Sequence, residues 1–447
     1  MSFGVDELCF STSYWYSGID LLEIGQRYGQ PALRNLVFHA VAFEANKLGS
    51  LKPDLIDFGP YEDLVTPEFQ KLWMAIFQNV WAQWRYENDL PDYPGPEIKT
   101  SGKASSSHKA LDHEIGQLQV LSFVGGGKDS LVSMSLMEEA GIPFATYGYS
   151  SSIYGESSRQ HELIDNLVKR TASRRHHRHW VYDDFIDSPV LELSGSTIRT
   201  LTAAETPSSV FGALPVALLE GYSLLAVGHE HSADFGNLTW DKTGEEVNHQ
   251  WGKSLEAEIL IQNYIQTQLI STISYASVLK PIYDPVIFGS LNKSLASVKA
   301  THSCNSTKPW CEKCAKCAYV WINYLAFLPP GAIKGMFKSN LLDTPENQIW
   351  FRQMLGLADH TPFECVGQVT EARLAFELAD RRGYKGEAMT MFKAECPRFE
   401  QTSQTDELLS VAPDHHNMPD WLAGAILPVM RGNAQLTRDI VESLLGY

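Results

Sequence analysis

The sequence has no long run of apolar residues, and its basic side chains are outnumbered by acidic ones. The 36 Lys and Arg residues against 53 Asp and Glu residues give a formal net charge of −17. Such a charge balance is a poor match for a phosphate backbone, so we expect no nucleic-acid partner. No apolar stretch is long enough to span a bilayer, so we expect no membrane association.

We also expect neither a secretory signal nor a disulfide framework. The first fifteen residues contain Asp6 and Glu7 and lack a basic segment followed by an apolar one. Seven cysteines are few for 447 residues, and four of them fall between residues 304 and 317. This distribution is typical of a metal site in a reducing compartment. We therefore predict a cytoplasmic protein.

The length of the chain predicts more than one structural unit. Apolar residues at near-helical spacing over 33–48 and 69–84 indicate two amphipathic helices in an N-terminal unit. The stretch 93–109 is rich in Pro, Ser and Lys and indicates a linker or an exposed loop. We predict three domains: a largely helical one over 1–113, a nucleotide-binding one over 114–300, and a metal-knuckle and helical region over 301–447.

Strand and helix patterns alternate after the linker. This alternation predicts an α/β fold, with a parallel doubly wound sheet covered by helices on both faces. Beyond Cys317 the pattern becomes largely helical. We expect strands at 119–124, 144–149, 179–182 and 224–227, and helices at 130–140, 160–171, 215–220, 371–382 and 435–445.

Basic side chains gather in one place, between residues 169 and 179. Five Lys or Arg residues and three His residues fall in this run. It is typical of a solvated helix end and loop, and the alternative is a collar for a substrate phosphate.

Three consecutive glycines follow the expected strand at 119–124. Glycine lets the backbone approach a ligand closely, and successive amides can form an anion nest that the start of the next helix reinforces. Asp129 is suited to hold a magnesium ion or to cap the helix, and Ser130 to donate to a phosphate oxygen. The predicted nucleotide-binding residues of this loop are Gly125, Gly126, Gly127, Lys128, Asp129 and Ser130.

The spacing of this loop is neither that of a Walker A loop nor that of a dinucleotide-binding loop. It resembles the Ser-Gly-Gly-x-Asp-Ser loop of the PP-loop superfamily, with Gly125 in place of the first Ser. The resemblance implies a fold of the PP-loop/HUP type. It also implies an enzyme that cleaves ATP between the α and β phosphates, grips the pyrophosphate in this loop and adenylates a substrate.

A second polar cluster, residues 228–234, follows the expected strand at 224–227. In a doubly wound sheet the carboxyl ends of the strands form the ligand crevice, so this cluster is predicted to face the glycine loop. It resembles the second signature of PP-loop proteins. The candidates here are His229, Glu230 and His231 for catalysis and Asp234 for nucleotide binding.

Four cysteines with short spacings indicate a metal site. Thiolates in a C-x6-C-x2-C-x2-C pattern suit a tetrahedral Zn²⁺, with an iron–sulfur cluster as the alternative. The pattern resembles the zinc site of QueC-type deazaguanine nitrile synthases. Four protein ligands close the coordination shell, which makes the site structural. The ligands are Cys304, Cys311, Cys314 and Cys317.

Several strings together resemble one family within the superfamily. They are residues 124–133, 244–254, 310–317, 340–343 and 362–367, and the likeness runs from about Leu33 to about Arg382. They resemble the MurL family of ATP-dependent UDP-N-acetylmuramoyl-L-alanyl-L-glutamate epimerases. The N-terminal segment before Leu33 is shorter than in that family, and residues 228–232 replace an expected Asn-Glu-Arg-Ser string.

The resemblance implies ATP and Mg²⁺ as cofactors and a peptide or UDP-sugar-peptide as substrate. ATP adenylates the terminal carboxylate, the Cα proton is exchanged, and hydrolysis releases AMP. Besides the three residues after the strand at 224–227, the acid–base candidates are His249, Lys253, Glu364 and Cys365.

Two other functions stay open at this point. In one, ammonia or sulfur attacks the adenylate, as in QueC-like or tRNA-modifying PP-loop enzymes. In the other, the chain only senses a nucleotide. The oligomeric state is left undetermined.

Overall fold

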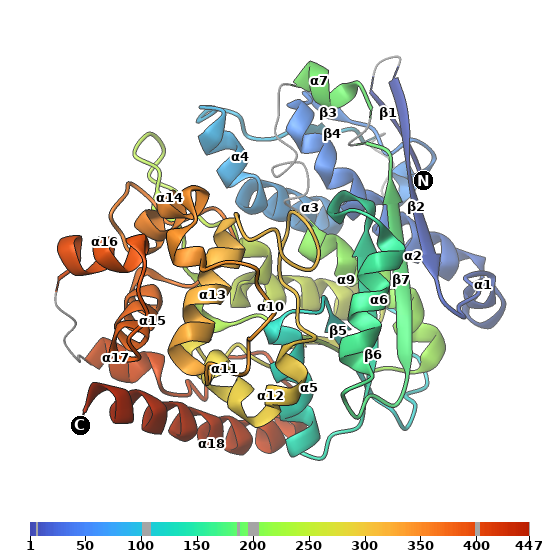
Figure 1. Ribbon diagram of the computed structural model, residues 1–447. Helices are drawn as coiled ribbons and strands as arrows, with labels where there is room; N and C mark the ends of the chain where they lie inside the picture. The colour runs from blue at the N-terminus through green and yellow to red at the C-terminus, as the bar shows by residue number, and fades with distance from the viewer. Residues whose placement is uncertain (6–7, 101–108, 186–187, 195–204, 398–402, 447) are drawn as a thin grey trace.

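A seven-stranded sheet lies at the centre of the computed structural model, which describes residues 1–5, 8–100, 109–185, 188–194, 205–397 and 403–446 (Figure 1). Five neighbouring strands run parallel, and an antiparallel hairpin extends one edge. In spatial order the strands are β1 (Ser2–Val5), β2 (Leu8–Tyr16), β7 (His176–Asp183), β6 (Phe144–Ser151), β5 (Val120–Val124), β8 (Leu224–Val227) and β11 (Ser274–Ser277).

The parallel part of the sheet confirms the expected alternation of strands and helices. Its strands lie in the order third, second, first, fourth and fifth along the chain, so the direction of winding reverses between β5 and β8. Ligands of open α/β sheets bind beyond the carboxyl ends of strands at such a reversal. The glycine loop follows β5 and the His229 cluster follows β8, so both begin at this point.

Helices cover both faces of the sheet. Val120, Leu224 and Ala276 face one hydrophobic cluster, and Leu121, Leu225 and Tyr275 face the other, as alternation along buried strands requires. The first cluster includes helices α5 (Lys128–Glu139), α6 (Ser157–Val168), α11 (Asp284–Ser290), α13 (Ala315–Phe327), α15 (Val369–Arg381) and α18 (Asp420–Leu445). The second includes α2 (Gln30–Glu44), α3 (Pro67–Val80), α9 (Glu205–Glu220) and α10 (Leu255–Tyr264).

The N-terminal segment departs in part from the expected, largely helical unit. Helices α2, α3 and α4 (Ala82–Glu87) match the expected pair of amphipathic segments, but β2 also joins the central sheet. Thr12 pairs with Asp183, and Lys47 contacts both of them, at 2.6 Å and 2.5 Å from its Nζ atom. The sheet is therefore mixed rather than wholly parallel. Residues of β2 alternate in burial with a period of two, and this pattern could have predicted the strand from the sequence.

The expected linker at 93–109 is only partly within the described residues. Its first part contains β4 (Glu97–Ile98), which pairs with β3 (Leu55–Ile56), and residues 101–108 lie outside the described part. The boundaries of the three expected domains remain predictions.

The histidine end of the basic run at 169–179 matches neither expectation. It is not a solvated loop, and it does not form a collar for a phosphate. His177 and His179 are buried in β7, where they hydrogen-bond to Tyr222 at 2.8 Å and Tyr147 at 2.5 Å. Burial lowers the pKa of His179 to about 3, so this imidazole is neutral. Arg178 instead forms an ion pair with Asp165 at 2.6 Å.

The C-terminal third is helical, as expected. In Figure 1 its helices gather on one side of the molecule, and α18 runs along the base. Within the described residues, none of the helices combines the length and apolar character needed to cross a bilayer. The remaining short helices here are α12 (Leu295–Val298), α14 (Pro345–Met354), α16 (Glu387–Glu395) and α17 (Ser403–Leu408). Elsewhere in the fold lie α1 (Leu22–Tyr28), α7 (Val190–Ser194), β9 (Leu238–Thr239) and β10 (Glu246–Val247).

Candidate functional site

The glycine loop has the strand–loop–helix geometry that its sequence predicts. Gly126 has φ +91°, and a Cβ there would lie 2.0 Å from Cε1 of His302, so glycine is required on both grounds. The His302 N–H donates to the Gly126 carbonyl at 2.8 Å, and the Gly125 N–H donates to Ser130 Oγ at 3.2 Å. Helix α5 begins at Lys128 and directs its positive end at the loop.

Lys128 does not line the cavity at this loop, contrary to the expected role. Its side chain is fully buried, and its ammonium group contacts Asp129 at 2.5 Å and Asp284 at 2.6 Å. Burial alone would lower the pKa of Lys128, but the carboxylates of Asp129, Asp284 and Glu230 outweigh it and raise the pKa. Lys128 therefore holds two carboxylates together beneath the loop, and of these Asp129 reaches the cavity.

Three other lysines supply positive charge to the cavity of about 240 Å³ beside the glycine loop. Lys253 was a candidate from the sequence, whereas Lys308 and Lys316 were missed. Both missed lysines lie in the cysteine-rich segment, where the metal pattern drew attention to the cysteines alone. Together with the loop amides they make this cavity suitable for a polyphosphate. Lys253, Lys308, Lys316, Asp129 and Ser130 are among its lining residues.

A second cavity, of about 430 Å³, adjoins the first. The two share five lining residues, so their walls are continuous. A substrate group in the second cavity is thereby placed next to a phosphate group in the first. The shared residues are Tyr154, Glu205, Lys253, Asn305 and Cys365.

Cys365 and Lys253 form a charged pair at this junction. The Lys253 Nζ atom donates to Cys365 Sγ at 2.8 Å. Burial alone would raise the pKa of the Cys365 thiol, but Lys253 and, less strongly, His249 lower it to about 6. The thiolate in turn helps to raise the pKa of Lys253 against the opposing effect of burial. At neutral pH the pair is a thiolate and an ammonium ion, which are a proton acceptor and a cation able to bind an anion.

Glu364 and His249 border the same cavity and are held by neighbours. Glu364 is buried and accepts a hydrogen bond from Asn305 at 2.9 Å. Nδ1 of His249 lies 2.6 Å from Oε1 of Gln83. The structure therefore brings together Lys253, His249, Glu364 and Cys365, four of the seven residues that the sequence nominated for catalysis.

The other three nominated residues, His229, Glu230 and His231, line neither of these two cavities. The His229 N–H donates to Ser277 Oγ at 2.8 Å, and burial holds the pKa of its imidazole far below the usual value. His231 stacks between Tyr283 and His415, with ring centroids 4.3 Å and 4.1 Å away. The expectation that this cluster faces the glycine loop has no support for the two histidines. Glu230 does lie near Lys128 of that loop and near Lys253 and Lys316, whose charges outweigh burial and lower the pKa of its carboxyl group.

Asp234 is also directed elsewhere. Its carboxylate accepts from Lys280 at 2.9 Å and from the Leu255 N–H at 2.8 Å, and lies 2.5 Å from His415 Nε2. Against the effect of burial, His415 and Lys280 lower its pKa to about 2. Asp234 lines a separate cavity of about 700 Å³ and not the one at the glycine loop, so its expected contact with nucleotide has no support in the geometry.

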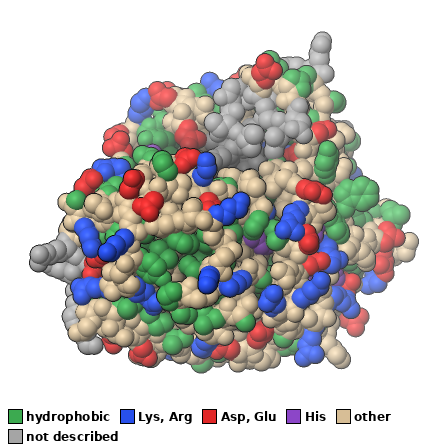
Figure 2. All heavy atoms as spheres, viewed as in Figure 1, with side chains coloured by type: hydrophobic (Ala, Val, Ile, Leu, Met, Phe, Trp, Pro, Cys, Tyr) green, Lys and Arg blue, Asp and Glu red, His purple; other side chains and the backbone are tan. Residues whose placement is uncertain are grey.

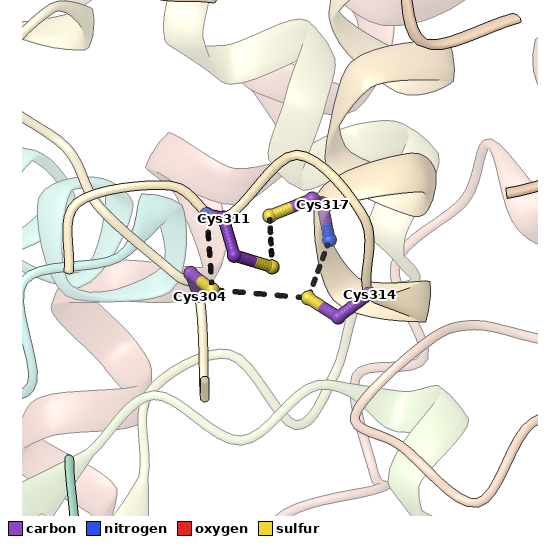
Figure 3. A group of neighbouring side chains, drawn as sticks. All are labelled: Cys304, Cys311, Cys314 and Cys317. Carbon is purple, nitrogen blue, oxygen red and sulfur yellow. Dashed lines mark hydrogen bonds between the residues drawn. The ribbon is translucent and has the colours of Figure 1, made fainter. Parts of the chain in front are cut away.

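The four cysteines converge as the metal interpretation requires (Figure 3). Sγ of Cys304 lies 3.8 Å from that of Cys314, and Sγ of Cys311 lies 3.9 Å from that of Cys317. All four sulfur atoms lie within 4.8 Å of one another. A tetrahedron of Zn–S bonds places its sulfurs about 3.8 Å apart, so the cluster fits one such ion. Lys308, in the loop between Cys304 and Cys311, and Lys316, in the first turn of α13, both line the cavity beside the glycine loop.

Comparison with known proteins identifies the family. Residues 55–173 and 208–278 match the MurL N-terminal domain, and residues 288–408 match the MurL C-terminal domain. The chain belongs to the MurL family. No solved structure matches it.

Relatives in this family carry one name, UDP-N-acetyl-alpha-D-muramoyl-L-alanyl-L-glutamate epimerase. The chain is 29% identical to the protein from Micromonospora sp. over 317 residues, which cover 68% of the chain and 66% of the relative. It is 27% identical to the Salinispora tropica protein, also over 66% of that relative's length. Identity to the Xanthomonas oryzae protein is 25%, over 79% of the chain and 78% of the relative. The chain thus spans just under two thirds of the length of the first two relatives.

Both MurL domains contribute to the joined cavities. The glycine loop, Tyr154 and Lys253 fall within the N-terminal match, whereas the metal knuckle and Cys365 fall within the C-terminal match. Glu205 lies between the two matched segments of the N-terminal domain. The site is therefore complete only when the two domains pack together.

Proposed function

We propose that the chain is an ATP-dependent epimerase that inverts the terminal residue of a UDP-sugar peptide. The substrate we assign is UDP-N-acetylmuramoyl-L-alanyl-L-glutamate, as the names of the MurL relatives suggest, and the role is peptidoglycan precursor synthesis. The observation that carries the proposal is the continuity of the polyphosphate cavity with the cavity at the Cys365–Lys253 pair. We place the protein in the cytoplasm, where such nucleotide-linked precursors and ATP are available.

In this proposal the glycine loop binds the phosphates of ATP. Gly125 and Gly127, which line the cavity, and the start of α5 surround the pyrophosphate, as in the PP-loop type of fold. Lys308 and Lys316 neutralise its charge, and Asp129 is placed to hold Mg²⁺. The order of the parallel strands accommodates this fold, because the loop lies where the winding reverses.

Adenylation serves to make the Cα proton removable. A free carboxylate leaves the neighbouring C–H very weakly acidic, whereas an acyl-adenylate has lost that charge and delocalises the carbanion as an enolate. The Cys365 thiolate is placed to take the proton, and the ammonium group of Lys253 to stabilise the enolate oxygen. Hydrolysis of the inverted adenylate then releases AMP and the free acid.

The knuckle cysteines hold a structural Zn²⁺ in this proposal. Four thiolates leave no coordination position for a substrate, so the ion supports the fold rather than the reaction. Its contribution to the site is indirect, through the placement of Lys308 and Lys316.

Incubation with the UDP-sugar dipeptide, ATP and magnesium in deuterated water tests the proposal. We expect D-glutamate that carries one deuterium at Cα, together with equimolar AMP and pyrophosphate and without any added amine. Unlabelled L-glutamate beside AMP, across a panel of peptides, would defeat the epimerase assignment. Turnover that starts only after ammonia is supplied would favour a QueC-like ligase instead.

A further inference from the structure

An inversion that passes through a planar enolate needs a proton donor on the face opposite the base. The sequence nominated seven acid–base candidates but did not pair any of them with Cys365. The wall that the two cavities share contains two more polar groups with the chemistry for this task, Tyr154 and Glu205. They come from the turn after β6 and from the first residue of α9, whereas Cys365 comes from the C-terminal region.

Glu205 is a buried carboxyl group whose environment differs from that of an ordinary glutamate. The Tyr154 hydroxyl donates to Oε2, while Oε1 is buried without a hydrogen-bond partner among the described residues, although Tyr149 is near. Burial raises the pKa of Glu205 to about 7, and the neighbouring hydroxyl groups of Tyr154 and Tyr149 oppose that rise. A carboxyl group with this pKa is able both to donate and to accept a proton near neutrality.

The Glu205–Tyr154 pair and the Cys365–Lys253 pair are close but separately held. Each pair is joined by its own hydrogen bond, and the charge of Cys365 contributes to the raised pKa of Tyr154. Lys308 lies over the Tyr154 ring, 5.4 Å from its centroid, and fixes this side of the wall next to the phosphate cavity. A carbon atom between the pairs would meet a thiolate from one segment and a carboxyl group from another.

We propose that Glu205, oriented by Tyr154, is the second catalytic acid–base of the inversion, opposite Cys365. This inference rests on the proposed epimerase function. In one direction the Cα–H bond breaks, its proton goes to the Cys365 thiolate, and the electron pair moves to the acyl oxygen as an enolate. The O–H bond of Glu205 then breaks, its proton goes to the other face of Cα, and the enolate electrons form the new C–H bond. The reverse direction uses the same two groups with their roles exchanged.

Single-site variants of the full chain, assayed with each epimer separately in deuterated water, test this assignment. Glu205→Gln should lower net inversion at least about a hundredfold while AMP formation persists. It should still exchange the Cα proton of the one epimer whose proton faces Cys365. Cys365→Ala should lose inversion equally but exchange the other epimer. A purely structural role for Glu205 would not produce this mirror-image pattern.

Control variants distinguish a failure of this inference from a failure of the proposed function. Glu114→Gln removes an exposed carboxylate that lines neither cavity and should match the unaltered protein. Glu205→Asp, a second variant in case the amide fails to fold, should retain partial inversion, and Tyr154→Phe should lower inversion without abolishing it. Two outcomes would overturn this inference without affecting the proposed function. One is inversion by Glu205→Gln at the unaltered rate. The other is an equal loss of AMP formation and inversion in folded Glu205→Gln and Glu205→Asp. If the unaltered protein forms no AMP with any peptide, the proposed function fails first, and this inference falls with it.

Discussion

The polar loops after β5 and β8 begin at neighbouring strand ends, but their side chains have different surroundings. The loop after β5 exposes backbone amides and Asp129 to a cavity, whereas the loop after β8 directs Glu230 and Asp234 into buried charge networks. The cause is what packs above each loop. The loop after β8 is covered by Glu371 of α15, which accepts a hydrogen bond from Ser232, and by His415. The partners that the rest of the chain supplies therefore decide which of the two loops lines the cavity beside the glycine loop.

Among the described residues, the protein surface in Figure 2 shows no basic area that would mark the site from outside. On the face shown in Figure 2, basic and acidic side chains are interspersed rather than gathered in one basic area. Lys253, Lys308 and Lys316, which line the cavity beside the glycine loop, instead come to it from distant segments. Cationic charge at the site is thus a local property of the tertiary structure.

The largest expected effect comes from a change in the cluster of four cysteines. Cys314→Ser should abolish zinc binding and most of the soluble yield, because a structural zinc site contributes on the order of 10 kcal/mol to folding. Metal analysis of the unaltered protein should give about one zinc per chain. Cys9→Ser, which changes an exposed thiol, is the matched control. An active, stable preparation without metal would contradict the structural role.

Asp129→Asn tests the open loop directly. If Asp129 anchors magnesium on the leaving pyrophosphate, AMP formation by the folded protein should fall at least about a hundredfold. Some stability is lost as well, because the buried Lys128 then keeps only Asp284 as a carboxylate partner. The change should be read as kcat with saturating ATP, with AMP and pyrophosphate measured as products. ADP as the sole nucleotide product would refute the loop's assigned chemistry.

Asp234→Asn tests the covered loop and should show the opposite pattern. The substitution leaves Lys280, which is fully buried, without its carboxylate. Breaking such a pair costs about 3–5 kcal/mol, so denaturant unfolding should show a loss of that order. AMP formation by the folded fraction should stay within about threefold of the unaltered protein, since Asp234 does not line the glycine-loop cavity. If Asp234→Asn lowered the rate of AMP formation without lowering the free energy of unfolding, Asp234 would act at the site like Asp129, and this prediction would be wrong.

The smallest expected effect is a shift in thiol reactivity at the junction of the two cavities. The pKa of Cys365 is lowered to about 6, so the thiolate predominates above that pH and protonation removes it below. The rate of alkylation at Cys365, followed by peptide mass spectrometry, should therefore rise with a midpoint near pH 6. Lys253→Met should move the midpoint upward, because it removes the ammonium group that lowers the pKa of Cys365. An unchanged midpoint in this variant would show that Lys253 is not the cause.

Much of the fold was predictable because it depends on local patterns. The glycine loop, the strands around it and the helices α2, α3, α5 and α6 all carry their periodicity in short segments. The cysteine knuckle was predictable for the same reason, since its four ligands lie within fourteen residues. The β2–β7 pairing joins residues some 170 positions apart, and no local pattern specifies such a partner.

The site was only partly predictable. The amides of the glycine loop and the pair Lys253 and Cys365 were nominated from strings of residues, but the role of Lys128 was misjudged. Its neighbour Asp284 lies 156 residues away, and the buried ion pair between them follows from packing alone. Tyr154 and Glu205 were not nominated at all, because a lone tyrosine and a lone glutamate have no distinguishing sequence pattern.

The sequence by itself determined the family, the alternation of strands and helices, the glycine loop and the cluster of four cysteines. Each of these is encoded in neighbouring residues, whose spacing is preserved by the chain whatever its tertiary structure. Only the tertiary structure decided which charges face a cavity and which face one another. That choice depends on the free energy of burying a charge, which is unfavourable unless a partner from elsewhere in the chain arrives. For Lys128 that partner is Asp284, and for Cys365 it is Lys253.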